Sequence, residues 1–322
     1  MNRKEFLTGA YALALGGILP VGARAAQSLP KLDLTADDRK RLNGVLDIHV
    51  HAAPDTKARL LTEIEVVEQA KAAGFRGIMF KSNDFSCHDR AFLIDQMIDG
   101  IGVWGSVCMN DVVGNRVNPI VARKAVGTTG KLCRCIWMPT QNAEYQIKTY
   151  KQKGAVSIPV LDNGKVLPEV VEVMEICAEH DIIFASGHSG PEETLVLAQK
   201  AREVGVKKFV VTHANSGIWT MTHDQIRKAI DLGAFVEYSY ITNLWGPGTG
   251  LPDFKRQSDA EFCAFAAIDP SRSFVTTDLG QVGMPSPVTG MLTCIKALEK
   301  AGLSSAQIDM LTKTNPAHLV GL

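Results

Sequence analysis

The chain has 322 residues, of which 46% are hydrophobic and 21% are charged, a composition typical of a soluble globular protein of enzyme size. Lysine plus arginine and aspartate plus glutamate both number 34, so net charge gives no indication of a nucleic acid or an anionic membrane surface as partner. No linker rich in proline, glycine or serine divides the chain, and we therefore expect one domain after the N-terminal segment.

The N-terminal segment has the pattern of an export signal. Arg3 and Lys4 precede an apolar stretch that ends in small residues, which is the order found in cleavable signal peptides. The run Arg-Lys-Glu-Phe-Leu also resembles the twin-arginine export motif, with lysine in place of the second arginine. We predict that residues 1–25 are a signal peptide and that residues 26–322 form the mature chain. We expect export, to the periplasm, by the twin-arginine or the Sec route, with no membrane insertion after the signal is removed.

The seven cysteines are an odd number for an exported protein. Most of them lie in apolar segments, as Cys177 and Cys294 do, and no pair of CxxC motifs is present. We expect buried thiols and no disulfide framework.

Eight continuous apolar runs predict β-strands of a parallel sheet that is covered on both faces. Amphipathic segments between them predict helices, several of which end at a glycine before the next strand, as at Gly74, Gly205 and Gly233. The expected strands are 44–51, 75–81, 101–109, 132–138, 182–187, 208–212, 234–240 and 273–277. The expected helices include 62–73, 89–98, 168–179, 192–203, 222–232 and 289–300.

Eight strands that alternate with helices point to a single-domain (β/α)8 barrel of the TIM type. An open doubly wound sheet is the alternative, but it usually has a glycine-rich phosphate loop where this chain has His-Ala-Ala-Pro-Asp. Two long excursions follow the fourth and seventh strands. Residues 141–166 should contain a short β-hairpin that turns at Asn163-Gly164, and residues 242–258 surround Trp245. Both leave from the carboxyl ends of strands, so we expect them to form walls or lids of a pocket.

The first strand, in the stretch GVLDIHVHAAPD, carries polar residues in an apolar run. Residues two apart on a strand point to the same side, so Asp47, His49 and His51 should form one polar row. Two imidazoles on one face are a natural start to a metal site. The alternative is that one histidine is a hydrogen-bonded core residue and the other lies in a loop.

Further polar residues end other strands at the same side of the barrel. His188 ends the fifth strand, His213 the sixth and Asp278 the eighth, and Lys81 ends the second. The carboxyl ends of barrel strands meet at one mouth, so these side chains should converge there with the histidine pair.

This ordered set resembles the amidohydrolase superfamily, which has D-x-H-x-H on strand 1, histidines on strands 5 and 6 and an aspartate on strand 8. The likeness spans the mature chain, including the N-P-A-x-L-x-G-L ending at residues 315–322, and it indicates an uncharacterised branch. It implies that His49, His51 and Asp278 bind a divalent metal, with Asp278 taking a proton from the attacking water. It also implies that His188 and His213 complete a second site, or that His188 joins the first site and His213 polarises the substrate. Donors of this N/O type favour Zn²⁺, with Mn²⁺, Fe²⁺ or Co²⁺ as alternatives.

The fourth strand departs from that pattern, because its end lacks the carboxylated lysine or glutamate that bridges two metals in binuclear members. Lys81 is the one lysine at the correct face. It could be carboxylated and bridge two metals, bind an anionic substrate group, or pair with a carboxylate such as Asp47. The number of metals, one or two, is therefore open.

Four other residues complete the expected site. Arg59 could bind an anionic substrate group, and Trp245 and Tyr240 could line the pocket as substrate-binding residues. Glu237, inside the seventh strand, could face the barrel interior in an ion pair, for example with Lys81, or take part in catalysis.

The resulting hypothesis is a metal-dependent hydrolase that cleaves an amide, ester, lactone or phosphoester bond of a small molecule. The alternatives are a metal-dependent decarboxylase or lyase on the same barrel and a barrel that binds metal or ligand without catalysis. No nucleic acid is expected as partner, and an oligomer of identical chains is left open.

Overall fold

The computed structural model describes residues 32–218, 221–247, 249, 251 and 254–322. The predicted signal peptide, residues 1–25, lies outside the described residues. Within these described ranges, no helix combines the length and the apolar character needed to cross a membrane.

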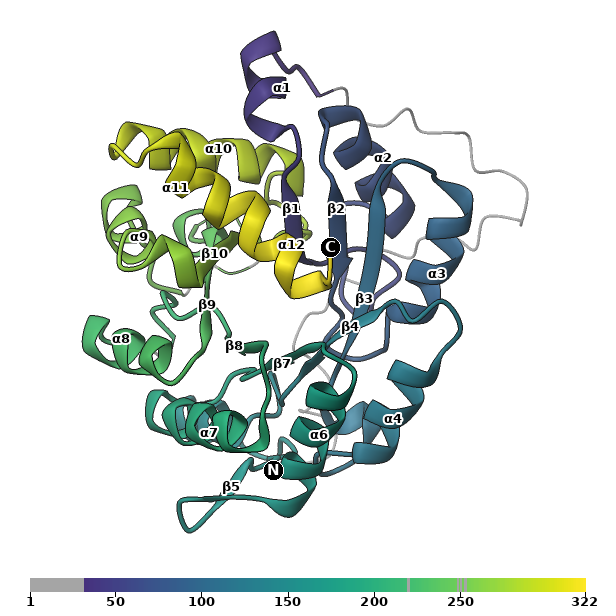
Figure 1. Ribbon diagram of the computed structural model, residues 1–322, viewed down its shortest axis with the longest axis vertical. Helices are drawn as coiled ribbons and strands as arrows, with labels where there is room; N and C mark the ends of the chain where they lie inside the picture. The colour runs from purple at the N-terminus through teal and green to yellow at the C-terminus, as the bar shows by residue number, and fades with distance from the viewer. Residues whose placement is uncertain (1–31, 219–220, 248, 250, 252–253) are drawn as a thin grey trace, which may run out of the picture. The chain divides into compact units, whose positions relative to one another are not determined.

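Eight parallel strands form a barrel, in the order β1-β2-β3-β4-β7-β8-β9-β10 (Figure 1). The strands are β1 (Leu46–Val50), β2 (Gly77–Phe80), β3 (Gly102–Cys108), β4 (Cys133–Trp137), β7 (Ile183–Ala185), β8 (Phe209–Val211), β9 (Phe235–Ser239) and β10 (Ser273–Thr276). The first and last strands meet just beyond β10, where the Asp278 amide donates to the His49 carbonyl at 3.0 Å and the His51 amide donates to the Leu279 carbonyl at 2.8 Å. All eight predicted strands are present, and the single-domain (β/α)8 prediction is confirmed.

Helices pack around the strands (Figure 1). The α-helices are α1 (Ala36–Leu42), α2 (Glu63–Ala73), α3 (His88–Met97), α4 (Pro119–Gly127), α5 (Glu144–Thr149), α6 (Pro168–Glu179), α7 (Pro191–Val204), α8 (His223–Asp231), α9 (Asp259–Ala266), α10 (Pro287–Lys300), α11 (Ser305–Asp309) and α12 (Asn315–Val320). Short helical turns of other types are η2 (Asp111–Val113), η3 (Tyr240–Asn243), η4 (Pro270–Arg272) and η5 (Met310–Thr314).

Capping residues set the ends of these helices. Thr62 and Glu65 form a reciprocal capping box at the start of α2, which satisfies amide groups that have no partner within the helix. Gly74 ends the same helix with φ of 92°, a conformation that favours glycine, and Gly205 ends α7 in the same way.

The apolar core has two layers, one inside the barrel and one between the strands and the helices. The inner layer includes Trp104, Trp137 and Phe274, and α12 contributes Ala317 and Leu319 to it. The C-terminal helix therefore packs against the barrel interior, which leaves the opposite, carboxyl end of the strands for the polar residues.

The excursion after β4 contains the predicted hairpin. Strands β5 (Leu161–Asp162) and β6 (Lys165–Val166) pair antiparallel, and Asn163 and Gly164 turn between them with φ of 48° and 76°. All seven cysteines are buried thiols.

Candidate metal centre

Strand β1 contains an irregularity that sets the direction of its polar side chains. Asp47 pairs with Ile78 and Val50 pairs with Phe80, so β1 has one residue more than β2 between these two pairs. Ile48 belongs to the cluster inside the barrel, and the ring of the next residue, His49, lies 4.7 Å from the Trp137 ring in the same interior. Two consecutive side chains therefore face inward.

Asp47 is separated from the histidines by this bulge, so the predicted polar row of three residues is wrong. Its buried carboxylate accepts hydrogen bonds from the Thr277 amide at 3.1 Å and from the Thr277 hydroxyl at 2.5 Å. Thr277 adjoins Gly290 of α10, so Asp47 ties β1 to the end of β10 on the helix side. Burial raises the pKa of Asp47 to about 7, against the hydrogen bonds from Thr277 that lower it. The suggested pairing of Asp47 with Lys81 is also absent.

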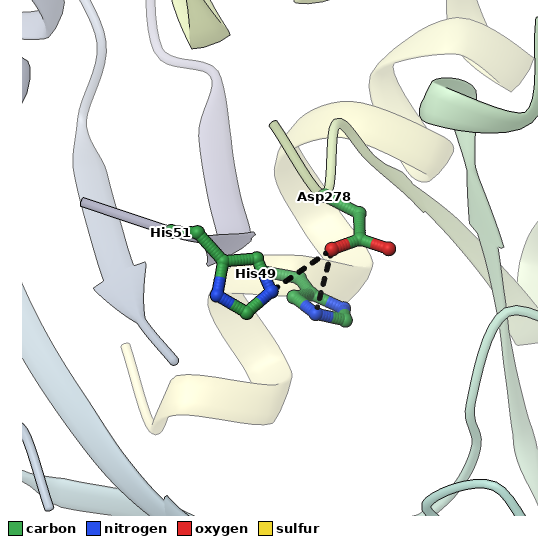
Figure 2. A group of neighbouring side chains, drawn as sticks. All are labelled: His49, His51 and Asp278. Atoms are coloured by element: carbon green, nitrogen blue, oxygen red, sulfur yellow. Dashed lines mark ion pairs between the residues drawn. The ribbon is translucent and has the colours of Figure 1, made fainter. Parts of the chain in front are cut away.

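Three side chains converge on one point at the mouth of the barrel. Oδ1 of Asp278 lies 3.2 Å from Nε2 of His49 and 3.1 Å from Nε2 of His51 (Figure 2). The three potential ligand atoms lie within 4.8 Å of one another. Ligand bonds of 2.0–2.1 Å in tetrahedral geometry place neighbouring ligand atoms about 3.3 Å apart, so these spacings suit a small divalent cation.

Glu237 fixes the orientation of the first histidine. Nδ1 of His49 lies 2.6 Å from Oε1 of Glu237, and because a carboxylate can only accept, Nδ1 carries the ring proton. The Thr276 hydroxyl donates to the same oxygen at 2.7 Å. The sequence suggested Lys81 as the partner of Glu237, whereas the structure pairs Glu237 with His49.

Nε2 of His49 consequently presents a lone pair to the carboxylate of Asp278. This nitrogen is buried and accepts no hydrogen bond from the described residues. Burial lowers the pKa of His49 to about 3, so the ring is neutral near pH 7 and the contact is not an ordinary ion pair. Two acceptors 3.2 Å apart repel each other unless a cation lies between them.

The second histidine has a different neighbour. Nδ1 of His51 lies 3.2 Å from Nη2 of Arg59, which also forms a buried ion pair with Asp55 at 3.0 Å. A guanidinium can only donate, so Nδ1 accepts and the proton of the neutral ring is on Nε2. A metal on Nε2 would require the proton on Nδ1, and Arg59 would then have to leave this nitrogen.

His188 and His213 lie beside the three-residue group without belonging to it. Their ring centroids are 5.0 Å apart, and that of His213 is 5.7 Å from that of His49. Nδ1 of His188 is hydrogen-bonded to the side-chain oxygen of Gln146, and the His213 amide donates to Glu237 at 3.3 Å. Burial lowers the pKa of both rings, that of His213 to about 3, so both are neutral.

A cavity of about 510 Å³ opens over these residues. His51, His188, His213 and Asp278 line it, as do Lys81, Arg59 and Trp245. Tyr240 does not line it and is therefore not placed for the predicted substrate contact. Its side chain is buried, its hydroxyl donates to Asp259 at 2.9 Å, and its ring packs on Phe262.

Two residues of this site could not be predicted from the sequence. Gln146 lies on α5, in the excursion after β4, and no local pattern indicated that it would reach His188. Lys57 lines the cavity from the loop after β1, two residues before Arg59. The role of Glu237 had a readable signal, because Phe235, Glu237 and Ser239 alternate along β9 and so share the interior face.

Three solved structures that share this fold carry the names of an amidohydrolase, a probable dipeptidase and an organophosphorus hydrolase. An amidohydrolase from Pseudomonas aeruginosa superposes with a TM-score of 0.60 at 9% identity, over 89% of this chain and 98% of that chain. The probable dipeptidase PvdM from the same organism superposes with a TM-score of 0.59 at 10% identity, over 88% of this chain and 96% of that chain. An organophosphorus hydrolase from Deinococcus radiodurans superposes with a TM-score of 0.56 at 12% identity, over 86% of this chain and 92% of that chain. At these identities the likeness shows the fold.

Sequence comparison places the chain in a family. The comparison with curated proteins finds no match. The model of a family of unknown function, DUF6282, matches residues 44–237, which include His49, His51, His188, His213 and Glu237. That match covers more than half of the chain, which therefore belongs to the family of unknown function DUF6282 and has the barrel fold of amidohydrolases.

Proposed function

We propose that the protein is a metal-dependent hydrolase of the amidohydrolase type, with a divalent metal held by His49, His51 and Asp278. The observation that carries the proposal is the buried Nε2 of His49, which faces Oδ1 of Asp278 with no proton to share. The nitrogen and oxygen donors suit Zn²⁺, with Mn²⁺, Fe²⁺ and Co²⁺ as alternatives. A divalent ion bound there supplies Lewis acidity, which brings the pKa of a water toward neutrality and polarises the bond to be cleaved.

Asp278 is the general base of this proposal. Oδ1 faces both histidine rings, while Oδ2 points away from them (Figure 2). Asp278 also lines the cavity, so Oδ2 can take a proton from the attacking water and pass it to the leaving group.

His188 and His213 lie beside His49, Asp278 and His51 and have further roles in this proposal. The side-chain oxygen of Gln146 accepts a hydrogen bond from Nδ1–H of His188, so the lone pair of this neutral ring is on Nε2, a nitrogen able to serve as a further metal ligand. His213 is neutral and lines the cavity, and it polarises the substrate oxygen by donating a hydrogen bond.

The bond cleaved is an amide, ester, lactone or phosphoester of a small molecule. Support comes from the cavity volume of about 510 Å³, which lies in the range of small-molecule sites, and from the names of the proteins that share the fold.

A metal-dependent decarboxylase or lyase is the second candidate. It is favoured by one observation, that the described residues contain a single three-residue group able to hold a metal, because one ion suffices for decarboxylation. A panel of carboxylic acids tests this candidate. Release of carbon dioxide without uptake of water would show that the protein is a decarboxylase and not a hydrolase.

Replacement of Asp278 by asparagine tests the hydrolase. We expect Asp278→Asn to lower kcat/KM by about 100-fold or more, since the general base is lost, and to reduce metal content measured by elemental analysis. The substrates are nitrophenyl esters, nitroanilides, lactones and phosphotriesters, and Asp224→Asn is the control, since Asp224 is exposed on α8. Full activity in Asp278→Asn would refute the proposed base.

We also propose that residues 1–25 direct export and that the mature protein acts in the periplasm. The support is the basic, apolar and small-residue order of this segment. Cell fractionation with N-terminal sequencing of the full-length product tests it. An uncut chain recovered with the cytoplasm would refute it.

A further inference from the structure

Lys81 is a buried cation that no carboxylate of the described residues pairs with. It follows β2 at the mouth of the barrel, is 3% exposed, and lines the cavity. Among the described residues, its ammonium has one contact, with the Trp137 ring, whose centroid lies 5.0 Å from Nζ. An ammonium that is removed from water without a counter-ion is unfavourable, and a cation–π contact offsets this only in part.

The neighbouring cations differ from Lys81 in this respect. Arg59 pairs with Asp55 at 3.0 Å, and Lys57 is attracted by Asp55 and Asp84. Asp278 is the one carboxylate among the described residues that line the cavity, and its Oδ1 already faces two histidines. The described residues that line the cavity therefore carry an excess of positive charge, which a divalent metal would increase.

Part of the cavity lining is apolar. Trp245, Leu251, Phe254 and Ile241 line it and belong to one hydrophobic cluster, in which the Trp245 and Phe254 rings lie 5.0 Å apart. A ligand that fills the cavity would thus meet both the Lys81 cation and two aromatic rings.

We infer that Lys81, supported by Arg59, binds an oxyanion of the substrate, a carboxylate or a phosphate, while the apolar part of the substrate packs on Trp245 and Phe254. The inference rests on the proposed function and names its substrate class as apolar organic anions.

The position of Lys81 over Trp137 also bears on its charge. The face of an aromatic ring is electronegative, so it stabilises an ammonium and disfavours the negatively charged carbamate that a carboxylated lysine would carry. Lys81 is therefore assigned to the substrate rather than to a second metal.

The experiment measures binding of three probes to the metal-loaded full chain by calorimetry: benzoate, phenyl phosphate and the uncharged benzamide. The variants are Lys81→Met, which removes the charge, Lys81→Arg, which keeps it, and Lys124→Met, which removes an exposed charge on α4. Metal content is measured for each protein, and labelled bicarbonate reports any carbamate by NMR.

We expect at least one of the two anions to bind tenfold or more tightly than benzamide. Lys81→Met should lower the affinity for that anion about tenfold and should retain the metal content. Lys81→Arg should retain part of the preference, and Lys124→Met all of it. The anion that binds more tightly identifies the group as carboxylate or phosphate. Unchanged anion binding in Lys81→Met, or a carbamate signal with loss of metal in that variant, would overturn the inference.

Failure of the inference can be told from failure of the proposed function. If neutral and anionic substrates are turned over at equal rates, and Lys81→Met does not change these rates, the anion subsite is refuted and the hydrolase is retained. If anion binding depends on Lys81 but no substrate is turned over, the anion subsite is retained and the hydrolase is refuted.

Discussion

Glu237 decides which nitrogen of His49 is able to bind a metal. A carboxylate at 2.6 Å holds the proton on Nδ1, and the lone pair on Nε2 is left for a cation. The Thr276 hydroxyl and the His213 amide donate to the same carboxylate, so one buried acid connects β9, β10 and the histidines. This network joins residues that are far apart in the sequence. The alternation along β9 predicts that Glu237 lies on the interior face, but its hydrogen-bond partners could not be predicted from the sequence.

Replacement of Glu237 by glutamine should weaken metal binding. The amide of glutamine offers one acceptor oxygen, so its NH2 group faces a donor such as the Thr276 hydroxyl or the His213 amide. We expect the affinity for Zn²⁺ to fall 10- to 100-fold, the usual effect of losing a carboxylate behind a metal-binding histidine. Competition with a chromophoric chelator measures it.

Glu179→Gln is the matched control for this change, since Glu179 is exposed at the last residue of α6. It should bind Zn²⁺ as the unmodified chain does. Equal affinity in Glu237→Gln would show that Glu237 does not orient a metal ligand.

At the scale of elements, the strands could be predicted and the β1 bulge could not. Continuous apolar runs mark strands buried on both faces, and all eight appear in the structure. The bulge depends on the register between β1 and β2, which no property of residues 46–50 encodes on its own. For the same reason the inward direction of His49 and the outward direction of Asp47 became clear only from the pairing.

The loop after β10 approaches β1 so closely that Gly280 has no room for a side chain. Its φ is 135°, and a Cβ atom there would lie 1.7 Å from the carbonyl oxygen of His51. Gly280→Ala must therefore displace either His51 or the loop that carries Asp278. We expect a loss of about 2–5 kcal/mol in the free energy of unfolding, together with loss of bound metal. Urea unfolding and elemental analysis measure these effects.

Gly127→Ala provides the comparison, because a Cβ atom at the last residue of α4 meets nothing within 4 Å. Its stability should stay within about 0.5 kcal/mol of that of the unmodified chain. A similarly small effect of Gly280→Ala would mean that the loop after β10 is not held against β1.

For the whole molecule, burial of four histidines links stability to pH. Burial lowers the pKa of His49 and His213 to about 3 and that of His51 and His188 well below its usual value. Each unfolded histidine takes up a proton near pH 6.5, while the folded one does not until far lower pH. Below pH 6.5 the unfolded state therefore binds more protons, and the free energy of unfolding falls as the pH falls.

Asp47 acts in the opposite direction. Its folded pKa of about 7 exceeds the ordinary pKa of an aspartate, 3.8, so between these values the folded state holds one proton more than the unfolded state. In the difference in bound protons between the two states, this carboxyl cancels the contribution of one of the four histidines. Acid therefore still lowers the free energy of unfolding.

We accordingly expect the free energy of unfolding of the metal-free protein to decrease steadily from pH 7 to pH 5, measured by urea unfolding at each pH. Each histidine contributes a slope of about 1.4 kcal/mol per pH unit once the pH lies well below 6.5. His213→Asn should reduce the slope by about that amount, whereas His180→Asn, at an exposed position, should leave it unchanged. A free energy of unfolding that is constant from pH 7 to pH 5 would show that these four rings are not held neutral in the folded barrel. The donor set proposed for the metal would then lose its basis, because a metal binds the neutral form of the ring.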